Sequence, residues 1–169
     1  PSDLEGFHVS WKNQSDPPIT LNINQVRDSP LCTTIQWGSK SLSTVEHLLG
    51  ALAGCGLTHV HIEVSGEEIP LLDGSAKCWV EAISEVGVVT ANTPSKASLT
   101  LKESILIHRG QSVINATPAE RFKLIGIIDF PYKAIGQQMF SIDLSPSNFV
   151  KEIAPARTFG FLDQLKTLQ

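Results

Sequence analysis

The chain has 169 residues, 41% of them hydrophobic and 18% charged, and a formal net charge of −4. This composition is typical of a globular protein of one large or two small domains, and because no segment concentrates Lys and Arg we expect no nucleic-acid partner. No apolar run reaches the ~18 residues of a membrane span, and Pro1–Glu5 shows no signal-peptide pattern. The three cysteines form no C-x-x-C pair, which favours a reducing, cytoplasmic setting over a disulfide framework or a thiolate zinc site.

Hydrophobic patterning predicts the elements of the first half of the chain. Alternating apolar and polar residues are typical of a half-buried strand, and an apolar helical period closed by glycine is typical of a helix. On these grounds we expect strands at 19–24, 31–37 and 58–64 and helices at 43–55 and 76–86. Residues 91–96 follow neither pattern and are rich in Asn, Thr, Pro and Ser, so they are the expected linker.

The second half of the chain is predicted to be rich in strands. We expect strands at 98–107, 112–116, 121–130 and 139–144. A helix should follow from Ser145-Pro146 to about residue 154, because Ser suits the N-cap and Pro the first helical position. Strands precede helices in each half, which indicates an α+β protein of packed layers rather than a βαβ array.

The segment Ser43-Thr44-Val45-Glu46-His47-Leu48 places an acid and an imidazole at the start of a predicted helix. A zinc hydrolase needs a neutral imidazole to hold the metal and a carboxylate to take a proton from water. The same letters fit a capping box, in which Glu46 reaches back to the backbone N–H of Ser43. The local sequence alone favours the cap.

Two further groups of residues could carry chemistry. His59, His61 and Glu63 share one face of a predicted strand, and we interpret them as its solvent side because antiparallel sheets alternate in this way. The segment 157–161 places a cation, a hydroxyl and two aromatic rings around a glycine. It could donate a hydrogen bond to an oxyanion or simply pack its rings against a sheet.

Several segments together resemble the UDP-3-O-acyl-N-acetylglucosamine deacetylases, the zinc amidases of lipid A biosynthesis. They occur in the family's order and span nearly the whole chain. They are 31–33, 43–48 with 51–54, 68–76 (Glu-Ile-Pro-Leu-Leu-Asp-Gly-Ser-Ala), 129–131, 134–138, 152–153 and 156–161 (Ala-Arg-Thr-Phe-Gly-Phe).

The resemblance implies a fold and an activity. The fold would be two two-layer α+β sandwiches, with helices packed on a mostly antiparallel sheet: domain I at 1–90 and the N-terminal half of domain II at 97–169. The active site would lie between the domains, take a UDP-linked acylated glucosamine and use Zn²⁺. The implied roles are a metal ligand at His47, a general base at Glu46, an oxyanion donor at Thr158, and substrate contacts at Leu31, Cys32, Phe159 and Gly160.

The chain departs from the family pattern at both ends. The family's downstream H-D-x-x-G-D segment, which supplies the other zinc ligands, is absent, as are a later Lys and His. Glu5-Gly6-Phe7-His8 is at best a remnant of an early G-L-H segment, and Tyr132 stands where the family has His. The chain thus resembles a family member truncated at both ends, monomeric when complete and inactive alone. The alternative is a non-catalytic paralogue or fragment that serves as a structural or binding module.

Overall fold

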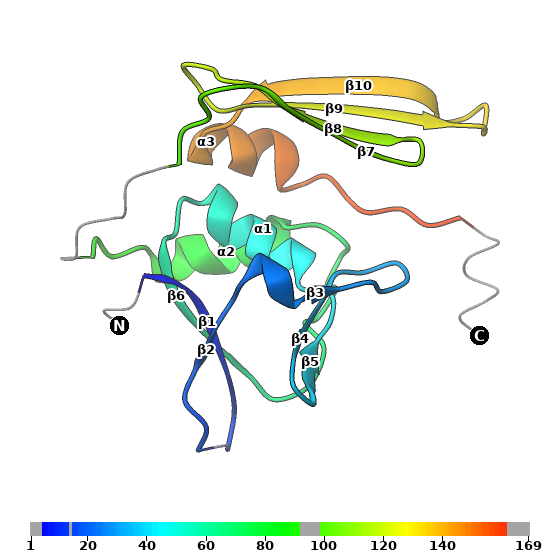
Figure 1. The fold of residues 1–169 in the computed structure, drawn as a ribbon. Helices are drawn as coiled ribbons and strands as arrows, with labels where there is room; N and C mark the ends of the chain where they lie inside the picture. The colour runs from blue at the N-terminus through cyan, green and yellow to red at the C-terminus, as the bar shows by residue number, and fades with distance from the viewer. Residues whose placement is uncertain (1–4, 14, 92–98, 162–169) are drawn as a thin grey trace. The chain divides into compact units, whose positions relative to one another are not determined.

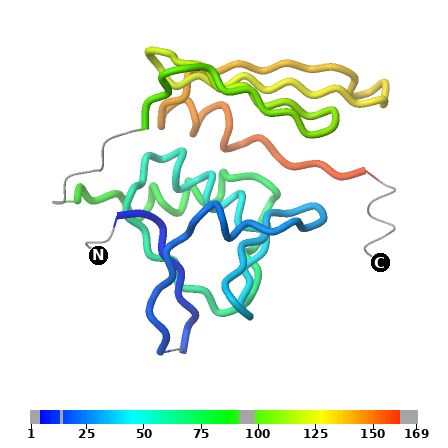
Figure 2. The backbone as a smooth tube through the Cα atoms, viewed as in Figure 1, coloured from blue at the N-terminus to red at the C-terminus, as the bar shows by residue number. Residues whose placement is uncertain are grey.

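A computed structural model describes residues 5–13, 15–91 and 99–161 (Figure 1; Figure 2). Contacts divide the chain into two compact units, one of residues 1–95 with 149–169 and one of residues 96–148. The helices and sheets confirm the α+β class. The sequence-based division placed 97–169 together, whereas contacts group 149–161 with the first unit. The family's domains at 1–90 and 97–169 stay a prediction.

The first unit contains a mixed sheet of β1 (Gly6–Trp11), β2 (Ile19–Thr20) and β6 (His59–Val64) in the order β2-β1-β6. β1 runs antiparallel to β2 and parallel to β6. The expected strand at 58–64 is confirmed. The expected strand at 19–24 is wrong after Thr20, because Asn22 and Gln25 cap a 3-10 turn, η1 (Ile23–Gln25), with their side chains.

A second, antiparallel sheet in this unit has the order β3-β4-β5, formed by β3 (Val26–Arg27), β4 (Thr34–Trp37) and β5 (Lys40–Leu42). The helices α1 (Glu46–Gly54) and α2 (Lys77–Val86) follow the expected positions and pack against each other.

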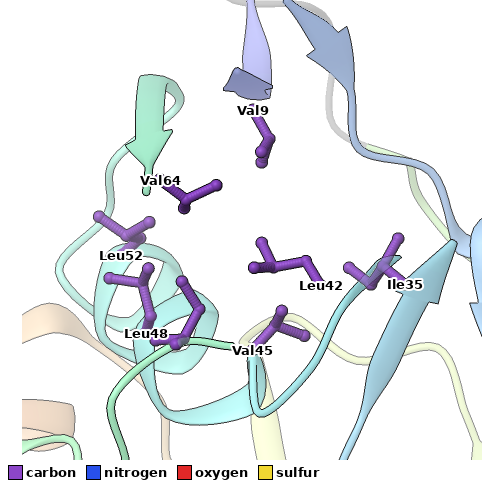
Figure 3. Close-up of a cluster of buried hydrophobic side chains, with 8 residues drawn as sticks. Val9, Ile35, Leu42, Val45, Leu48, Leu52 and Val64 are labelled. Atoms are coloured by element: carbon purple, nitrogen blue, oxygen red, sulfur yellow. The ribbon is translucent and has the colours of Figure 1, made fainter. Parts of the chain in front are cut away.

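One hydrophobic core joins both sheets to α1. Figure 3 labels its buried residues from the four strands β1, β4, β5 and β6 and from α1 with the residue before it; they are Val9, Ile35, Leu42, Val64, Val45, Leu48 and Leu52. Ile69, which follows β6, belongs to the same core. Apolar burial of this kind is the main favourable term in folding. The core therefore fixes the start of α1, which carries Glu46 and His47.

The second unit consists of two antiparallel hairpins, β7 (Ile105–Arg109) with β8 (Ser112–Ala116) and β9 (Lys123–Phe130) with β10 (Gly136–Asp143). The first of these strands is shorter than the expected 98–107, and the last begins earlier than the expected 139. Ile142 is the one buried residue among 99–148. Within the described part of the chain, no helix is long and apolar enough to cross a membrane.

The expected helix at 145–154 is irregular and links the units in sequence. It consists of a short turn, α3 (Pro146–Asn148), and a π-helical turn, η2 (Phe149–Ile153). Phe149 is buried and belongs to the first unit. Its ring lies where a side chain on Gly54 would be, since a Cβ there would come within 2.3 Å of Phe149 Cδ1.

This close approach predicts opposite effects for two glycines of α1. Gly54→Ala should lower the free energy of unfolding by about 1–3 kcal/mol, because the added methyl displaces the Phe149 ring. Gly50→Ala is the matched control: nothing lies within 4 Å of its Cβ, so better helix propensity should leave stability unchanged or raise it by up to about 1 kcal/mol. Urea unfolding of both variants measures this. Equal effects would contradict the contact.

Candidate functional site

The turn before α1 is tied to the segment that follows β6. The Ser43 N–H donates to Glu67 O at 2.9 Å, and the Ile69 N–H donates to Ser43 O at 3.0 Å. Thr44 and Val45 are buried. Backbone bonds on both sides of Ser43 therefore fix the direction in which α1 starts.

Glu46 does not cap its helix. Its Oε2 accepts a hydrogen bond from the Thr33 N–H at 3.0 Å, while α1 begins at Glu46 with Val45 at the N-cap and no side-chain cap. Since the Ser43 N–H is used by Glu67, the capping-box interpretation is wrong. The half-buried Glu46 side chain is instead hydrogen-bonded to the segment 31–34.

His47 is half-buried in the first turn of α1. Among the described residues no group of three His, Cys, Asp or Glu side chains could hold a metal ion. A catalytic zinc site uses three protein ligands, so the described residues do not by themselves fit a zinc ion. His61, on the exposed face of β6, lies 2.7 Å from Ser10 Oγ through its Nε2.

Strained backbone is concentrated in the segments singled out from the sequence. Thr44, Leu31 and Leu72 have φ of 58°, 63° and 56°. The left-handed region costs an L-residue about 1–2 kcal/mol, and a β-branched residue there is an outlier. Such strain persists where the surroundings enforce it and is common at functional sites. Here a hydrogen bond of 2.8 Å from Thr44 Oγ1 to Glu68 Oε1 helps to hold Thr44.

The Cys32 thiol, next to Thr33, is in contact with the hydroxyl groups of two neighbouring side chains. Its Sγ is 3.0 Å from Ser29 Oγ and 3.8 Å from Thr34 Oγ1. The Ser29 hydroxyl is the main cause of the lowered pKa of the Cys32 thiol. Thr34 Oγ1 in turn lies 3.0 Å from Ser43 Oγ. These contacts join residues 29–34 to the turn before α1.

The turn Asp73-Gly74-Ser75 forms a second cluster. Asp73 Oδ1 accepts from the Ser75 N–H at 3.1 Å and from the Ser75 hydroxyl at 2.8 Å, and the Ser75 hydroxyl lowers the pKa of Asp73. Ser75 Oγ also accepts from the Lys77 N–H at 3.1 Å. Ser75 thus binds the first residue of α2, while Ala76 occupies the N-cap position.

Residues 157–158 are anchored to this turn from far along the chain. Arg157 Nε donates to Asp73 O at 2.7 Å, and the Thr158 N–H donates to Gly74 O at 2.7 Å. Phe159 and Phe161 stack edge to face at 5.8 Å, and Phe159 is 57% exposed. The Arg157 side chain and the Thr158 backbone thus fix this segment, while Thr158 itself is exposed. The role of oxyanion donor that the family resemblance implies for Thr158 stays a prediction.

Three residues of this site were missed by sequence reasoning. Thr33 acts through a backbone N–H, which carries no side-chain signal. Thr44 acts through a left-handed conformation that its residue type disfavours. Glu68 was noted only as part of the segment 68–76. Its hydrogen bond to Thr44 joins residues far apart in the sequence, which local patterns do not reveal.

Comparison with known proteins identifies the family. The UDP-3-O-acyl N-acetylglycosamine deacetylase (LpxC) family model matches residues 1–169. The chain belongs to this family. Relatives named UDP-3-O-acyl-N-acetylglucosamine deacetylase include those of Thermosynechococcus vestitus (44% identical over 99% of this chain and 54% of the relative), Trichormus variabilis (45% over 90% and 56%) and Photobacterium profundum (40% over 91% and 52%). The chain spans about half the length of these curated relatives.

The backbone strain at Leu72, which directly precedes the turn Asp73-Gly74-Ser75, can be measured by comparing Leu72 with its neighbour Leu71. Leu71 and Leu72 are 47% and 52% exposed, but only Leu72 has a left-handed φ. Glycine removes the same side chain at both and is free of the left-handed penalty. Leu72→Gly should therefore retain about 1–2 kcal/mol more stability than Leu71→Gly in urea unfolding. Equal losses would show that Leu72 is not strained.

Proposed function

We propose that this chain forms part of an enzyme that removes the acetyl group of UDP-3-O-acyl-N-acetylglucosamine, an early committed step of lipid A biosynthesis. The observation that carries the proposal is the Glu46 carboxylate, held by the Thr33 N–H at 3.0 Å beside His47. Glu46 follows Thr44, whose left-handed backbone is strained, and such strain supports a functional site. The substrate in the proposal is taken from the names of the curated relatives.

In this proposal Glu46 takes a proton from the water that attacks the acetamide carbonyl. A carboxylate with one oxygen fixed by a backbone donor can accept that proton on its other oxygen without losing its orientation. Zn²⁺ is the proposed cofactor, with His47 as one ligand. Since the described residues do not hold the ion alone, further ligands would come from outside them.

Thr158 is the proposed donor to the developing oxyanion. Its N–H donates to Gly74 O, so the backbone positions the side chain. The residue is exposed, and its hydroxyl is the group that would be offered to a ligand. Preorganised donors of this kind stabilise tetrahedral intermediates because they need no reorientation during the reaction. The proposed substrate contacts are Leu31, Cys32, Phe159 and Gly160.

A second candidate is a non-catalytic module that keeps the fold and binds a partner. The observation that favours it is the missing set of metal ligands among the described residues. For the catalytic protein we propose a monomer in the cytoplasm.

The role of Glu46 can be tested in the Thermosynechococcus vestitus relative, at the position that aligns with Glu46. Replacement by Ala should lower turnover by roughly two to four orders of magnitude, the usual effect of losing a general base, with zinc content and melting temperature unchanged. A matched replacement by Ala at the position that aligns with Glu85, which is exposed on α2, should leave turnover unchanged. A stability loss with turnover intact would assign Glu46 a structural role only.

The metal proposal makes a separate prediction for the 169-residue chain. With one ligand from the described residues, the chain should retain less than one equivalent of zinc after dialysis and release no acetate from the substrate. Metal analysis and an acetate assay measure this, with the Thermosynechococcus vestitus relative as the positive control. Stoichiometric zinc together with acetate release would show that the ligand set lies within this chain.

A further inference from the structure

Glu68 is an acidic residue to which the proposed chemistry assigns no part. It follows β6 and is exposed, yet its Oε1 accepts a hydrogen bond from the Thr44 hydroxyl at 2.8 Å. Thr44 itself is buried and precedes Glu46 by two positions. An exposed carboxylate thus reaches a buried hydroxyl in the turn that leads into the proposed general base.

The conformation of Thr44 has to be imposed by its surroundings. Its φ of 58° lies in the left-handed region, where a β-branched residue is an outlier and glycine is the usual occupant. A buried hydroxyl that loses its acceptor bears the full cost of desolvation. Because the Thr44 hydroxyl meets Glu68 in this conformation, the bond favours it over a relaxed backbone.

The two residues that follow Thr44 both bind Thr33. The Thr33 N–H donates to Glu46 Oε2 at 3.0 Å, and Thr33 O accepts from the Val45 N–H at 3.4 Å. The backbone turns only about two dihedrals per residue, so a rotation at Thr44 moves Val45 and Glu46 together relative to Thr33. Relaxation of Thr44 would therefore break the bond that orients the Glu46 carboxylate.

We propose that Glu68 is a positioning residue for Glu46 and acts through the Thr44 hydroxyl. The Glu68 carboxylate holds the left-handed turn, and the turn places Glu46 against the Thr33 N–H. A group that is already in place when substrate binds needs no reorientation during the reaction. The consequence for turnover rests on the proposed function, whereas the effect on the bond between Glu46 and Thr33 does not.

The bond between Glu46 and Thr33 can be followed in the 169-residue chain by amide hydrogen exchange. Glu68→Ala should speed exchange of the Thr33 amide by about tenfold or more, because the turn can then relax. Glu68→Gln keeps an oxygen that can accept from the Thr44 hydroxyl, so its Thr33 rate should stay within about threefold of wild type. An unchanged Thr33 rate in Glu68→Ala would overturn the positioning role.

Two controls separate positioning from a general loss of stability. Glu67→Ala removes the neighbouring exposed carboxylate and keeps the backbone carbonyl, so Thr33 exchange should stay within about twofold of wild type. The Leu21 amide, which donates to a carbonyl of β1, should keep its rate in Glu68→Ala. An equal increase at Leu21 and Thr33 would assign Glu68 to stability alone and overturn the proposal.

The route through Thr44 is tested by a double-mutant cycle. Thr44→Val removes the hydroxyl and keeps a β-branched side chain, so it should speed Thr33 exchange about as much as Glu68→Ala does. If both changes act on one bond, the double variant should be no faster than either single variant. Effects that multiply would show that Glu68 does not act through Thr44.

Turnover is measured in the Thermosynechococcus vestitus relative, at the position that aligns with Glu68. Replacement by Ala should lower kcat by about tenfold or more and leave KM within about threefold, whereas Gln should keep kcat within about threefold of wild type. A raised KM with kcat unchanged would overturn the positioning of the base. Faster Thr33 exchange in this chain with unchanged turnover in the relative would support the hold of Glu68 on Glu46 and contradict the proposed function.

Discussion

The hydrogen bond from the Thr33 N–H to Glu46 Oε2 is the interaction on which the proposed site depends. The Glu46 side chain therefore binds the segment 31–34 and does not cap the N-terminus of α1. The turn that makes this possible contains Thr44 in a left-handed conformation, and the backbone bonds of Ser43 to Glu67 and Ile69 hold that turn. Strain in the turn is thus offset by contacts from a separate part of the chain.

The same support extends to the second cluster. The strand-like pairing of residues 67–69 with Ser43 leads directly into the segment that ends in Asp73-Gly74-Ser75. That turn holds both the start of α2 and the backbone of Arg157 and Thr158. The motif segments at 43–48, 68–76 and 156–161 are therefore linked by hydrogen bonds within one unit, in agreement with a common function. This arrangement also explains why residues 149–161 group with the first unit rather than with the hairpins that precede them.

Much of the fold was predictable because the spacing of apolar residues and the glycines and prolines at the ends of elements determine secondary structure locally. The strand at 58–64, the helices at 43–55 and 76–86 and the strand at 112–116 follow from such signals. β1 was missed although Phe7, Val9 and Trp11 alternate with polar residues, since its pairing with β6 joins segments about fifty positions apart. The strand expected at 19–24 ended early because local side-chain bonds at Asn22 compete with the sheet.

For the candidate site, the sequence supplied a set of residues with proposed roles but not their hydrogen-bond geometry. The pair Glu46-His47 and the segment 157–161 were identified from the sequence, but residues 43–46 taken alone favoured a capping box. Only the partner of the Ser43 N–H decides between the two interpretations, and that partner, Glu67, lies in another element. Likewise the anchoring of Thr158 on Gly74 depends on a backbone bond between residues 84 positions apart (158 − 74).

The central claim, that the Glu46 carboxylate binds Thr33 rather than caps α1, can be measured by NMR. A hydrogen bond to a side chain slows the exchange of the donor amide with solvent. Glu46→Ala should therefore speed the exchange of the Thr33 amide, which donates to Glu46, by about tenfold or more. The Ser43 amide donates to Glu67 O, so its exchange should stay within about twofold of the wild-type rate. Faster exchange of Ser43 with Thr33 unchanged would contradict the account.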